Sequence, residues 1–298
     1  MKVSVIIASY NYAQYIKESI ESVLNQTYSD FELVIIDDCS TDNSVEIINQ
    51  FKDNRIKFIQ NDKNLGLKST IQKALSHCTG EWIAFLESDD MWVSDTLEKR
   101  LACAEKYPNV GIIFNDVSEF GDEQWLLAVK KNFERVRKIL NKKKFPKNIF
   151  YDINLHNLIL TFSSVMIKRK FFENLNFETP VDALFDWWIY IHISYQTEAY
   201  YMKEKLTKWR QHRQSYITRK KKPNLKMPNI LAYLDVYKKN NLGISFIPFL
   251  LITIFGMMIS RSKYYNIVLI RKIKDILHIK KRQSPLFVDD ENTEHLVK

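Results

Sequence analysis

Apolar runs and amphipathic segments alternate along the first 92 residues of the chain. Four apolar runs have the length of buried strands: 3–8, 31–36, 55–60 and 82–86. Three segments between them carry apolar residues at the 3.6-residue spacing of helices: 13–25, 45–51 and 64–76. Ser40, Thr41 or Asp42 can cap the second of these helices. Because strands that alternate with helices are typical of βαβ units, we expect an α/β fold with a mainly parallel, Rossmann-like sheet that helices cover on both faces.

Polar residues follow three of the four predicted strands. Ser9 to Asn11 follow the first strand, Asp37 and Asp38 the second, and Ser88 to Asp90 the fourth. Ligands of parallel sheets bind beyond the carboxyl ends of the strands, so these groups are expected to line one site. The chain has neither a GxGxxG loop nor a P-loop, and carboxylates hold a diphosphate only through a divalent cation. A pair of aspartates after a strand can also be a plain helix cap or a solvated turn.

The composition agrees with a folded globular protein. Of the 298 residues, 46% are hydrophobic and 27% are charged. Cys39, Cys78 and Cys103 form neither a metal-ligand spacing nor a disulfide framework, which favours a reducing compartment. The start of the chain, MKVSVIIASY, has one lysine and only a short apolar run, so we interpret it as a buried strand and not as a signal peptide.

Charge is unevenly distributed along the chain. Residues 1–120 contain 11 Lys and Arg against 19 Asp and Glu, a net charge of −8, whereas residues 121–298 have a net charge of +17. This asymmetry indicates that the second half contacts an anionic partner, for which nucleic acid and an anionic membrane are the candidates. No nucleic-acid motif is present, and aromatic residues do not alternate with the basic runs as a base-stacking platform requires, so no nucleic-acid partner is expected.

The N-terminal motifs resemble those of a known enzyme family. The stretch VSVIIASYNYAQYIKESIESVLNQTYSDFELVIIDDCSTDNS, continued by NLGL at 64–67 and TGEWIAFLESDDMW at 79–92, closely resembles the opening of the family 2 glycosyltransferases, which have the GT-A fold. The resemblance is high over residues 1–95 and intermittent to about residue 215. It implies a metal-dependent, inverting transfer of a sugar from a UDP- or dTDP-sugar to a hydroxyl of a saccharide acceptor.

The resemblance also implies roles for individual residues at the strand ends. The residues expected to contact the nucleotide are Ala8, Tyr10, Asn11, Asp38, Lys68 and Asp89. Asp38 would pair with the base, Asp89 would lie near the ribose, and Asp90 would hold Mn²⁺ or Mg²⁺ on the diphosphate. The chain departs from the family at Glu87, where aspartate is commoner, and at Ile71, where many members carry an arginine. Lys68 would then supply the positive charge, although it can equally be a solvated helix residue.

A further acidic position falls in the segment LFDWWIYIHI. An inverting transfer needs a base for the acceptor hydroxyl, and Asp186 occupies the place where the family often has an acidic residue on a helix. The bulky Phe185, Trp187 and Trp188 would exclude water and raise the pKa of Asp186. Asp186 can instead be a helix N-cap beside core aromatics, and Asp182 is the reserve candidate. The DWW form resembles a subgroup that includes rhamnosyltransferases.

The segment WRQHRQS at 209–215 supplies the last candidates. The family frequently carries an arginine and a histidine in such a segment. His212 would be a further metal ligand or a diphosphate contact, and Arg210 or Arg213 would offset the charge of the leaving group. A histidine in a basic loop can equally be a plain surface residue.

The chain is expected to divide near residue 222. Residues 1–222 would form the GT-A catalytic domain, with KKKFPK at 142–147 and RKKK at 219–222 as solvated loops. Residues 223–298 would form a helical, basic C-terminal extension, because the uncharged segment 242–259 precedes a basic amphipathic stretch. This pattern favours a cytoplasmic enzyme bound peripherally to the inner membrane surface over a packed helix pair or a true span.

Three functions fit the sequence, and a glycosyltransferase of cell-surface polysaccharide or lipid-linked glycan assembly fits it best. Membrane attachment would suit an acceptor linked to polyprenyl diphosphate, as in many members of the family. A nucleotidyltransferase that makes an activated sugar is the first alternative, but it would carry a glycine- and arginine-rich loop where this chain has SYNYAQY. A catalytically inactive sugar- or nucleic-acid-binding protein is the second, and the presence of Asp90 and Asp186 argues against it.

Overall fold

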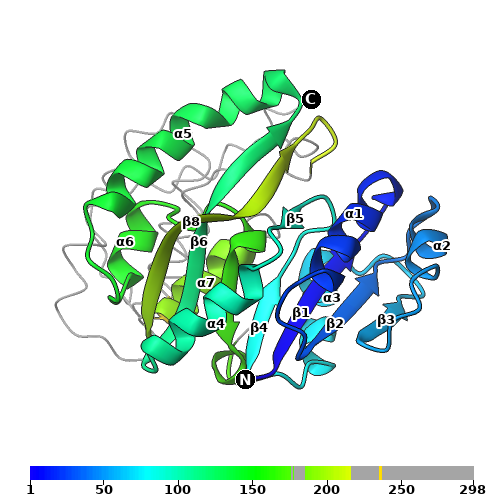
Figure 1. The fold of residues 1–298 in the computed structure, drawn as a ribbon, viewed down its shortest axis with the longest axis horizontal. Helices are drawn as coiled ribbons and strands as arrows, with labels where there is room; N and C mark the ends of the chain where they lie inside the picture. Colours follow the sequence, from blue (N-terminus) through cyan, green and yellow to red (C-terminus); the bar gives the residue numbers. More distant parts are fainter. Residues whose placement is uncertain (176, 178–184, 216–234, 237–298) are drawn as a thin grey trace, which may run out of the picture. The chain divides into compact units, whose positions relative to one another are not determined.

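A mostly parallel sheet organises the part of the chain that the structure describes (Figure 1). The computed structural model describes residues 1–175, 177, 185–215 and 235–236, which lie within one compact unit, Met1–Val236. The strands are β1 (Val3–Ser9), β2 (Phe31–Asp37), β3 (Ile56–Gln60), β4 (Trp82–Phe85), β5 (Met91–Trp92), β6 (Val110–Gly121), β7 (Val165–Lys168) and β8 (Glu198–Gln211). Their order across the sheet is β3-β2-β1-β4-β7-β6-β8-β5. The predicted α/β architecture is confirmed.

Helices pack on both halves of this sheet. The α-helices are α1 (Ala13–Leu24), α2 (Ser44–Ile48), α3 (Gly66–Ser76), α4 (Thr96–Lys106), α5 (Glu123–Asn141), α6 (Phe150–Leu155) and α7 (Phe185–Ser194). Two short 3₁₀ helices, η1 (Phe162–Ser164) and η2 (Arg169–Phe172), flank β7. In Figure 1, α5 runs along the long β6–β8 pair, and α1 and α3 lie over the β1–β2 half.

The half of the sheet around β1 forms as the sequence predicts. β1 pairs in parallel with both β2 and β4, and β2 pairs in parallel with β3. β1 and β2 are buried along almost their whole length, since helices cover the sheet, and this explains why their sequences are continuous apolar runs. Ser9 lies opposite Asp37 in the register. The polar ends of these two strands therefore meet at one edge of the sheet.

The other half of the sheet contains both parallel and antiparallel pairs, and its strand β8 ends near the acidic loop that follows β4. β7 is antiparallel to both β4 and β6, whereas β6 and β8 form a parallel pair that ends with Gly121 opposite Gln211. Gly121 has a φ of +112°, and a Cβ on it would collide with the backbone of Gln211. A glycine is needed here because the two backbones approach so closely just before His212.

Two predicted helices differ from the observed ones at their ends. α2 ends at Ile48 because the helix is a single short turn, and none of its three predicted caps lies at the N-cap, which is Asn43. α3 begins at Gly66 and not at Asn64, because the amides of Leu65 and Gly66 donate to Asp38. The second correction comes from a polar side chain that binds loop backbone.

Several expectations fall outside the described residues. These are the RKKK segment, Asp182, and the C-terminal extension apart from residues 235–236. Within the described residues, no helix combines the length and apolar character needed to cross a bilayer. The prediction of a solvated KKKFPK loop is wrong for two lysines, because Lys143 and Lys147 are half-buried and pair with Asp152 at 2.6 and 2.7 Å.

Candidate active site

Hydrogen bonds join the loops that follow β1 and β2. The amide of Asn11 donates to Ser40 Oγ at 2.9 Å, and Asn11 Oδ1 accepts from the amide of Thr41 at 2.8 Å. Asn11 has a φ of +57°, a left-handed conformation that asparagine tolerates better than most residues. Tyr10 is 38% exposed and Ala8 is half-buried. The Tyr10 ring is thus open to a ligand, whereas Asn11 holds the two loops in place.

Asp38 accepts hydrogen bonds from the loop before α3. Its Oδ1 accepts from Asn61 Nδ2 and from the amide of Leu65, and its Oδ2 accepts from the amide of Gly66, each at 2.8 Å. The residue is only 4% exposed. Because a carboxylate offers about four acceptor positions, one position on Oδ2 remains for a ligand. Asp38 therefore positions the start of α3 and keeps one free acceptor.

Lys68 and Ile71 occupy different environments on α3. Lys68 is half-buried in the first turn, two residues after Gly66, and forms no ion pair with any described residue. Ile71 is 2% exposed and belongs to the core, so an arginine at this position would disturb the packing. Ile71, where the family often carries an arginine, therefore serves stability here.

Two hydroxyl groups distant in sequence fix the acidic loop after β4. Thr161 Oγ1 donates to Glu87 Oε2, and Ser163 Oγ donates to Asp90 Oδ2, both at 2.6 Å. Ser163 Oγ also accepts from the amide of Glu87 at 2.9 Å. Asp90 is completely buried, whereas Glu87 and Asp89 are half-buried. The predicted carboxylates therefore lie together, and the segment around η1 orients them.

The end of β8 brings positive groups to the same loop. The amide of Arg210 donates to Asp90 Oδ1 at 2.9 Å, and its Nε donates to Asp89 O at 2.8 Å. The Arg210 guanidinium also pairs with Glu18 on α1. His212 Nε2 lies 2.9 Å from Asp89 Oδ2. Two of the three candidates from WRQHRQS, Arg210 and His212, thus contact Asp89 and Asp90.

His212 is not a plain surface residue. It is 8% exposed, and its ring lies 4.7 Å from the ring of Tyr15 on α1. Its Nδ1 is buried and has no hydrogen-bond partner among the described residues. Arg213, by contrast, is exposed. The histidine is therefore positioned with one nitrogen uncommitted, as expected of a residue that binds a ligand.

Asp186 lies in the first turn of α7, whose residues are apolar almost all round. It is the second residue of the helix and hence not its N-cap. Burial raises the pKa of Asp186 to about 6, as predicted from its bulky neighbours. Trp187 and Trp188 are themselves buried, at 7% and 3% exposure, so their faces belong to the core and are not open to a sugar.

The carboxylates influence one another electrostatically. Burial raises the pKa of Glu87, and the negative charges of Asp89 and Asp186 raise it further. Burial and the charges of Asp89 and Glu87 likewise raise the pKa of Asp90. The charge of Asp186 is thus one of the causes of the raised pKa of Glu87.

The sequence did not point to the groups that hold this region in place. Thr161 and Ser163 lie with Ser164 in the segment LTFSSV, and nothing in their spacing distinguishes them from core serines and threonines. Arg100 is also fully buried, and its Nη2 donates to Ser163 O at 3.1 Å and to Asn115 Oδ1 at 2.6 Å. Only the tertiary structure reveals that these residues support Asp90.

The donor set partly fits a divalent cation. Burial, and after it the charges of neighbouring carboxylates, raises the pKa values of Glu87 and Asp90, which a bound cation would lower, and oxygen ligands suit Mg²⁺ and Mn²⁺. His212 Nδ1 is in addition an uncommitted nitrogen. Among the described residues, however, no group of three or more His, Cys, Asp or Glu side chains converges as a metal site. The types of residue present are those that bind a divalent cation, but their side chains do not converge closely enough to form a complete site.

Solved structures share this fold. TarS of S. aureus (residues 1–349), in complex with UDP-GlcNAc, matches 93% of this chain and 81% of its own with a TM-score of 0.65 and 17% identity. The mannosyltransferase PcManGT from Pyrobaculum calidifontis, in complex with GDP-Man and Mn²⁺, matches 94% of this chain and 81% of its own with a TM-score of 0.54 and 16% identity. At these identities the likeness establishes the fold, which is the GT-A type that the sequence predicts.

Sequence relatives are closer. TuaG of Bacillus subtilis (strain 168), a glycosyltransferase named for teichuronic acid biosynthesis, is 33% identical over 56% of this chain and 62% of its own length. WfgD of Escherichia coli, named as a UDP-Glc:alpha-D-GlcNAc-diphosphoundecaprenol beta-1,3-glucosyltransferase, is 40% identical over 38% of this chain and 47% of its own. The matches thus span less than two thirds of these two relatives. The profile of glycosyl transferase family 2 matches residues 4–175, more than half of the 298 residues, and the chain belongs to this family.

Proposed function

We propose that the protein transfers a sugar, with inversion, from a nucleotide diphosphate to a hydroxyl of a saccharide carried on a lipid diphosphate, in the assembly of a cell-surface glycan. The observation that carries the proposal is the contact of Arg210 and His212, at the end of β8, with Asp89 and Asp90 of the acidic loop after β4. Such a transfer requires a diphosphate site and a base, for which Asp186 is the candidate. The name of WfgD supports an acceptor on a lipid diphosphate, and the name of TuaG supports the assembly of a cell-surface glycan.

In the proposed reaction, Asp186 takes the proton of the acceptor hydroxyl as the hydroxyl oxygen attacks the anomeric carbon. The bond between that carbon and the diphosphate oxygen breaks, and the diphosphate leaves with the electron pair. A carboxylate with a pKa of about 6 is mostly ionised at neutral pH and is a stronger base than an ordinary aspartate. Arg210, beside Asp89, would offset the charge of the leaving group, and His212 would contact the diphosphate or the metal.

A divalent cation is part of this proposal. Asp90 and His212, the ligands that the family resemblance implies, would hold it. Bound there, Mn²⁺ or Mg²⁺ would neutralise negative charge on the departing diphosphate. The PcManGT structure, a complex with GDP-Man and Mn²⁺, supports the choice of cation.

The free acceptor position of Asp38 favours particular nucleotides. Uracil and thymine present an N3–H at their pairing edge, and guanine presents an N1–H, whereas cytosine presents an acceptor there. A carboxylate oxygen attracts the first three and repels the last. This argument disfavours CDP. We propose a UDP- or dTDP-sugar as donor on the family resemblance, and the UDP-GlcNAc complex of TarS supports UDP. The exposed ring of Tyr10 can stack on the base.

A panel of nucleotides tests the proposal directly. The protein is heated with UDP, dTDP, GDP or CDP, each with and without Mn²⁺, alongside Asp90→Ala. A ligand at 100 times its Kd stabilises the folded state by about 2.7 kcal/mol. We expect a Mn²⁺-dependent stabilisation by UDP or dTDP that CDP does not give and that the variant lacks. If no nucleotide stabilises the folded protein, the site does not bind a nucleotide and the proposal is wrong.

A transfer assay then identifies the reaction. The preferred nucleotide is offered as its glucose, N-acetylglucosamine or rhamnose derivative, with N-acetylglucosaminyl diphospholipid as acceptor. A new glycolipid of inverted anomeric configuration is the expected product. Release of free sugar alone, without a glycolipid, would contradict the lipid-linked acceptor.

A further inference from the structure

Helix α5 has two faces of opposite character. Phe133, Val136 and Leu140 are buried against the rest of the domain. The residues on the opposite side, at helical spacings of three, four and seven, lie on one exposed or half-exposed stripe. We call this stripe the α5 basic face, and it consists of Leu127, Lys131, Glu134, Arg135, Lys138 and Lys142.

The charges of the α5 basic face are not used by the fold. Its three lysines form no ion pair with any described residue, and Arg135 donates only to His156 Nδ1, at 3.3 Å. Arg137, on the flank of the same helix, behaves differently: its guanidinium pairs with Asp116 and Glu119 at 2.9 and 2.8 Å. Arg137 is thus paired with acidic residues of the domain, whereas the four cations of the α5 basic face have no acidic partner among the described residues.

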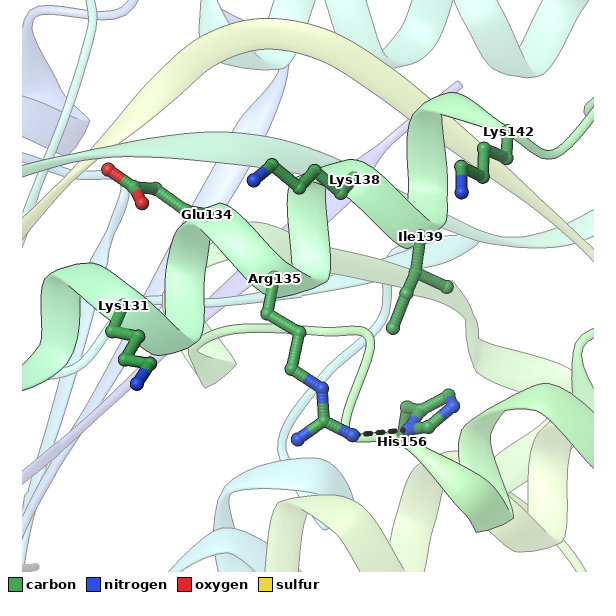
Figure 2. A pocket seen from close by; sticks show the side chains of 7 residues that line it. All are labelled: Lys131, Glu134, Arg135, Lys138, Ile139, Lys142 and His156. Carbon is green, nitrogen blue, oxygen red and sulfur yellow. Dashed lines mark hydrogen bonds between the residues drawn. The ribbon is translucent and has the colours of Figure 1, made fainter.

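The four outward cations surround a pocket of about 630 Å³, which Ile139, Glu134 and His156 also line. Figure 2 shows Arg135 reaching to His156 while the three lysines spread along the helix above it. Glu134 is the only acidic residue of this lining. Burial lowers the pKa of His156, and the positive charges of Arg135 and Lys143 lower it further, as a strongly positive surface requires.

One apolar residue accompanies these cations. Leu127 is 67% exposed and lies one helical turn before Lys131 on the same face. Contact with a bilayer interface would bury this side chain, whereas contact with a soluble polyanion would leave it in water. The α5 basic face has no Phe, Tyr or Trp on which bases could stack, which disfavours nucleic acid.

We propose that the α5 basic face docks the protein on an anionic lipid bilayer. Positive charges attract anionic headgroups and the exposed leucine enters the interface. The amide of Asp122, just before α5, donates to Gln211 O at 2.9 Å, so the helix begins beside His212. Docking along α5 would therefore hold the active-site end of the helix close to a lipid-anchored acceptor. The inference does not depend on the proposed transfer, because vesicle binding needs no activity.

Vesicle co-sedimentation of the full chain tests the proposal. Vesicles of phosphatidylglycerol with phosphatidylcholine are compared with vesicles of phosphatidylcholine alone, which should bind far less. In the triple variant Lys131→Gln, Lys138→Gln, Lys142→Gln, the partition coefficient on anionic vesicles should fall on the order of 100-fold, since each lysine near the surface contributes about fivefold. A matched triple variant at exposed lysines elsewhere, Lys52→Gln, Lys63→Gln, Lys106→Gln, should bind like the wild type. Equal binding by the two folded triple variants would overturn the proposal.

A second variant separates a bilayer from a soluble polyanion. Leu127→Ser should weaken binding to anionic vesicles severalfold and leave binding to heparin unchanged, because only a bilayer buries the leucine. If Leu127→Ser has no effect on vesicles while the lysine variant loses vesicles and heparin alike, the face binds soluble anions and the bilayer proposal is wrong.

Discussion

Replacing Asp186 with asparagine should stabilise the protein while it abolishes transfer. Burial raises the pKa of Asp186 from its ordinary 3.8 to about 6, so the folded state binds the proton more tightly than the unfolded chain by about two pKa units. At about 1.4 kcal/mol per unit, the ionised carboxylate costs at most about 3 kcal/mol of unfolding free energy at neutral pH. Asparagine carries no charge and keeps the oxygen that accepts from the amide of Trp187, so it removes this cost.

The sign of this effect depends on pH. Near pH 4, Asp186 is largely protonated in the folded state and partly in the unfolded state, and the two proteins should differ little. As the pH rises to about 6, the unfolded chain gives up its proton first, and the wild type loses stability relative to Asp186→Asn. Urea unfolding of both proteins near pH 4 and near pH 7.5 should therefore show a gap that grows by about 2–3 kcal/mol.

Asp152→Asn is the matched control for this experiment. Hydrogen bonds and charges from Lys143 and Lys147 outweigh its burial and lower the pKa of Asp152, so its ionised form stabilises the fold. This variant should be less stable than the wild type near pH 7.5, opposite in sign to Asp186→Asn. An Asp186→Asn protein that is also less stable there, or a gap that does not change with pH, would refute the reasoning from burial.

Three further predictions concern the same site. The kcat of the wild type should fall as the pH drops below about 6, because protonated Asp186 cannot act as a base, and a flat profile at saturating donor would contradict this role. Ser163→Ala should lower the free energy of unfolding by about 1–3 kcal/mol, measured in urea, since it removes a 2.6 Å hydrogen bond to the buried Asp90; no loss would mean that another donor replaces it. Gly66→Ala should weaken UDP binding in calorimetry, since the residue has a φ of +80° and its amide binds Asp38, whereas Gly66→Asn should retain more affinity; equal affinities would contradict the argument.

The strand-end residues could be predicted from the sequence because local rules govern them. The apolar runs define the strands, and the carboxyl ends of parallel strands meet at one edge, so the location of Tyr10, Asp38 and Asp90 could be predicted from position, whereas their roles rest on the family resemblance. The raised pKa of Asp186 was predictable for a similar reason, as its bulky neighbours adjoin it in the sequence. In each case, neighbours only a few positions away in the sequence determine the environment of the residue.

The remaining features depend on contacts that no local rule gives. Ser163 could have been any core serine, and only the antiparallel return of β7 between β4 and β6 brings it to Asp90. Asp38 was expected to face the base alone, yet three of its acceptor positions hold the loop before α3. The basic stripe on α5 is not evident in the sequence because its cations are spaced by helical turns and do not form a run.

The hydrogen bond from the amide of Arg210 to Asp90 joins residues 120 positions apart, and this separation orders events during synthesis. Domains fold from the N-terminus as the chain emerges at about 5–20 residues per second, so the acidic loop is made about 6–24 s before Arg210 can reach it. The acidic loop is therefore synthesised well before the residues of β8 that contact it. A chain released before residue 210 would lack Arg210 and His212, so it could not form their contacts with Asp89 and Asp90.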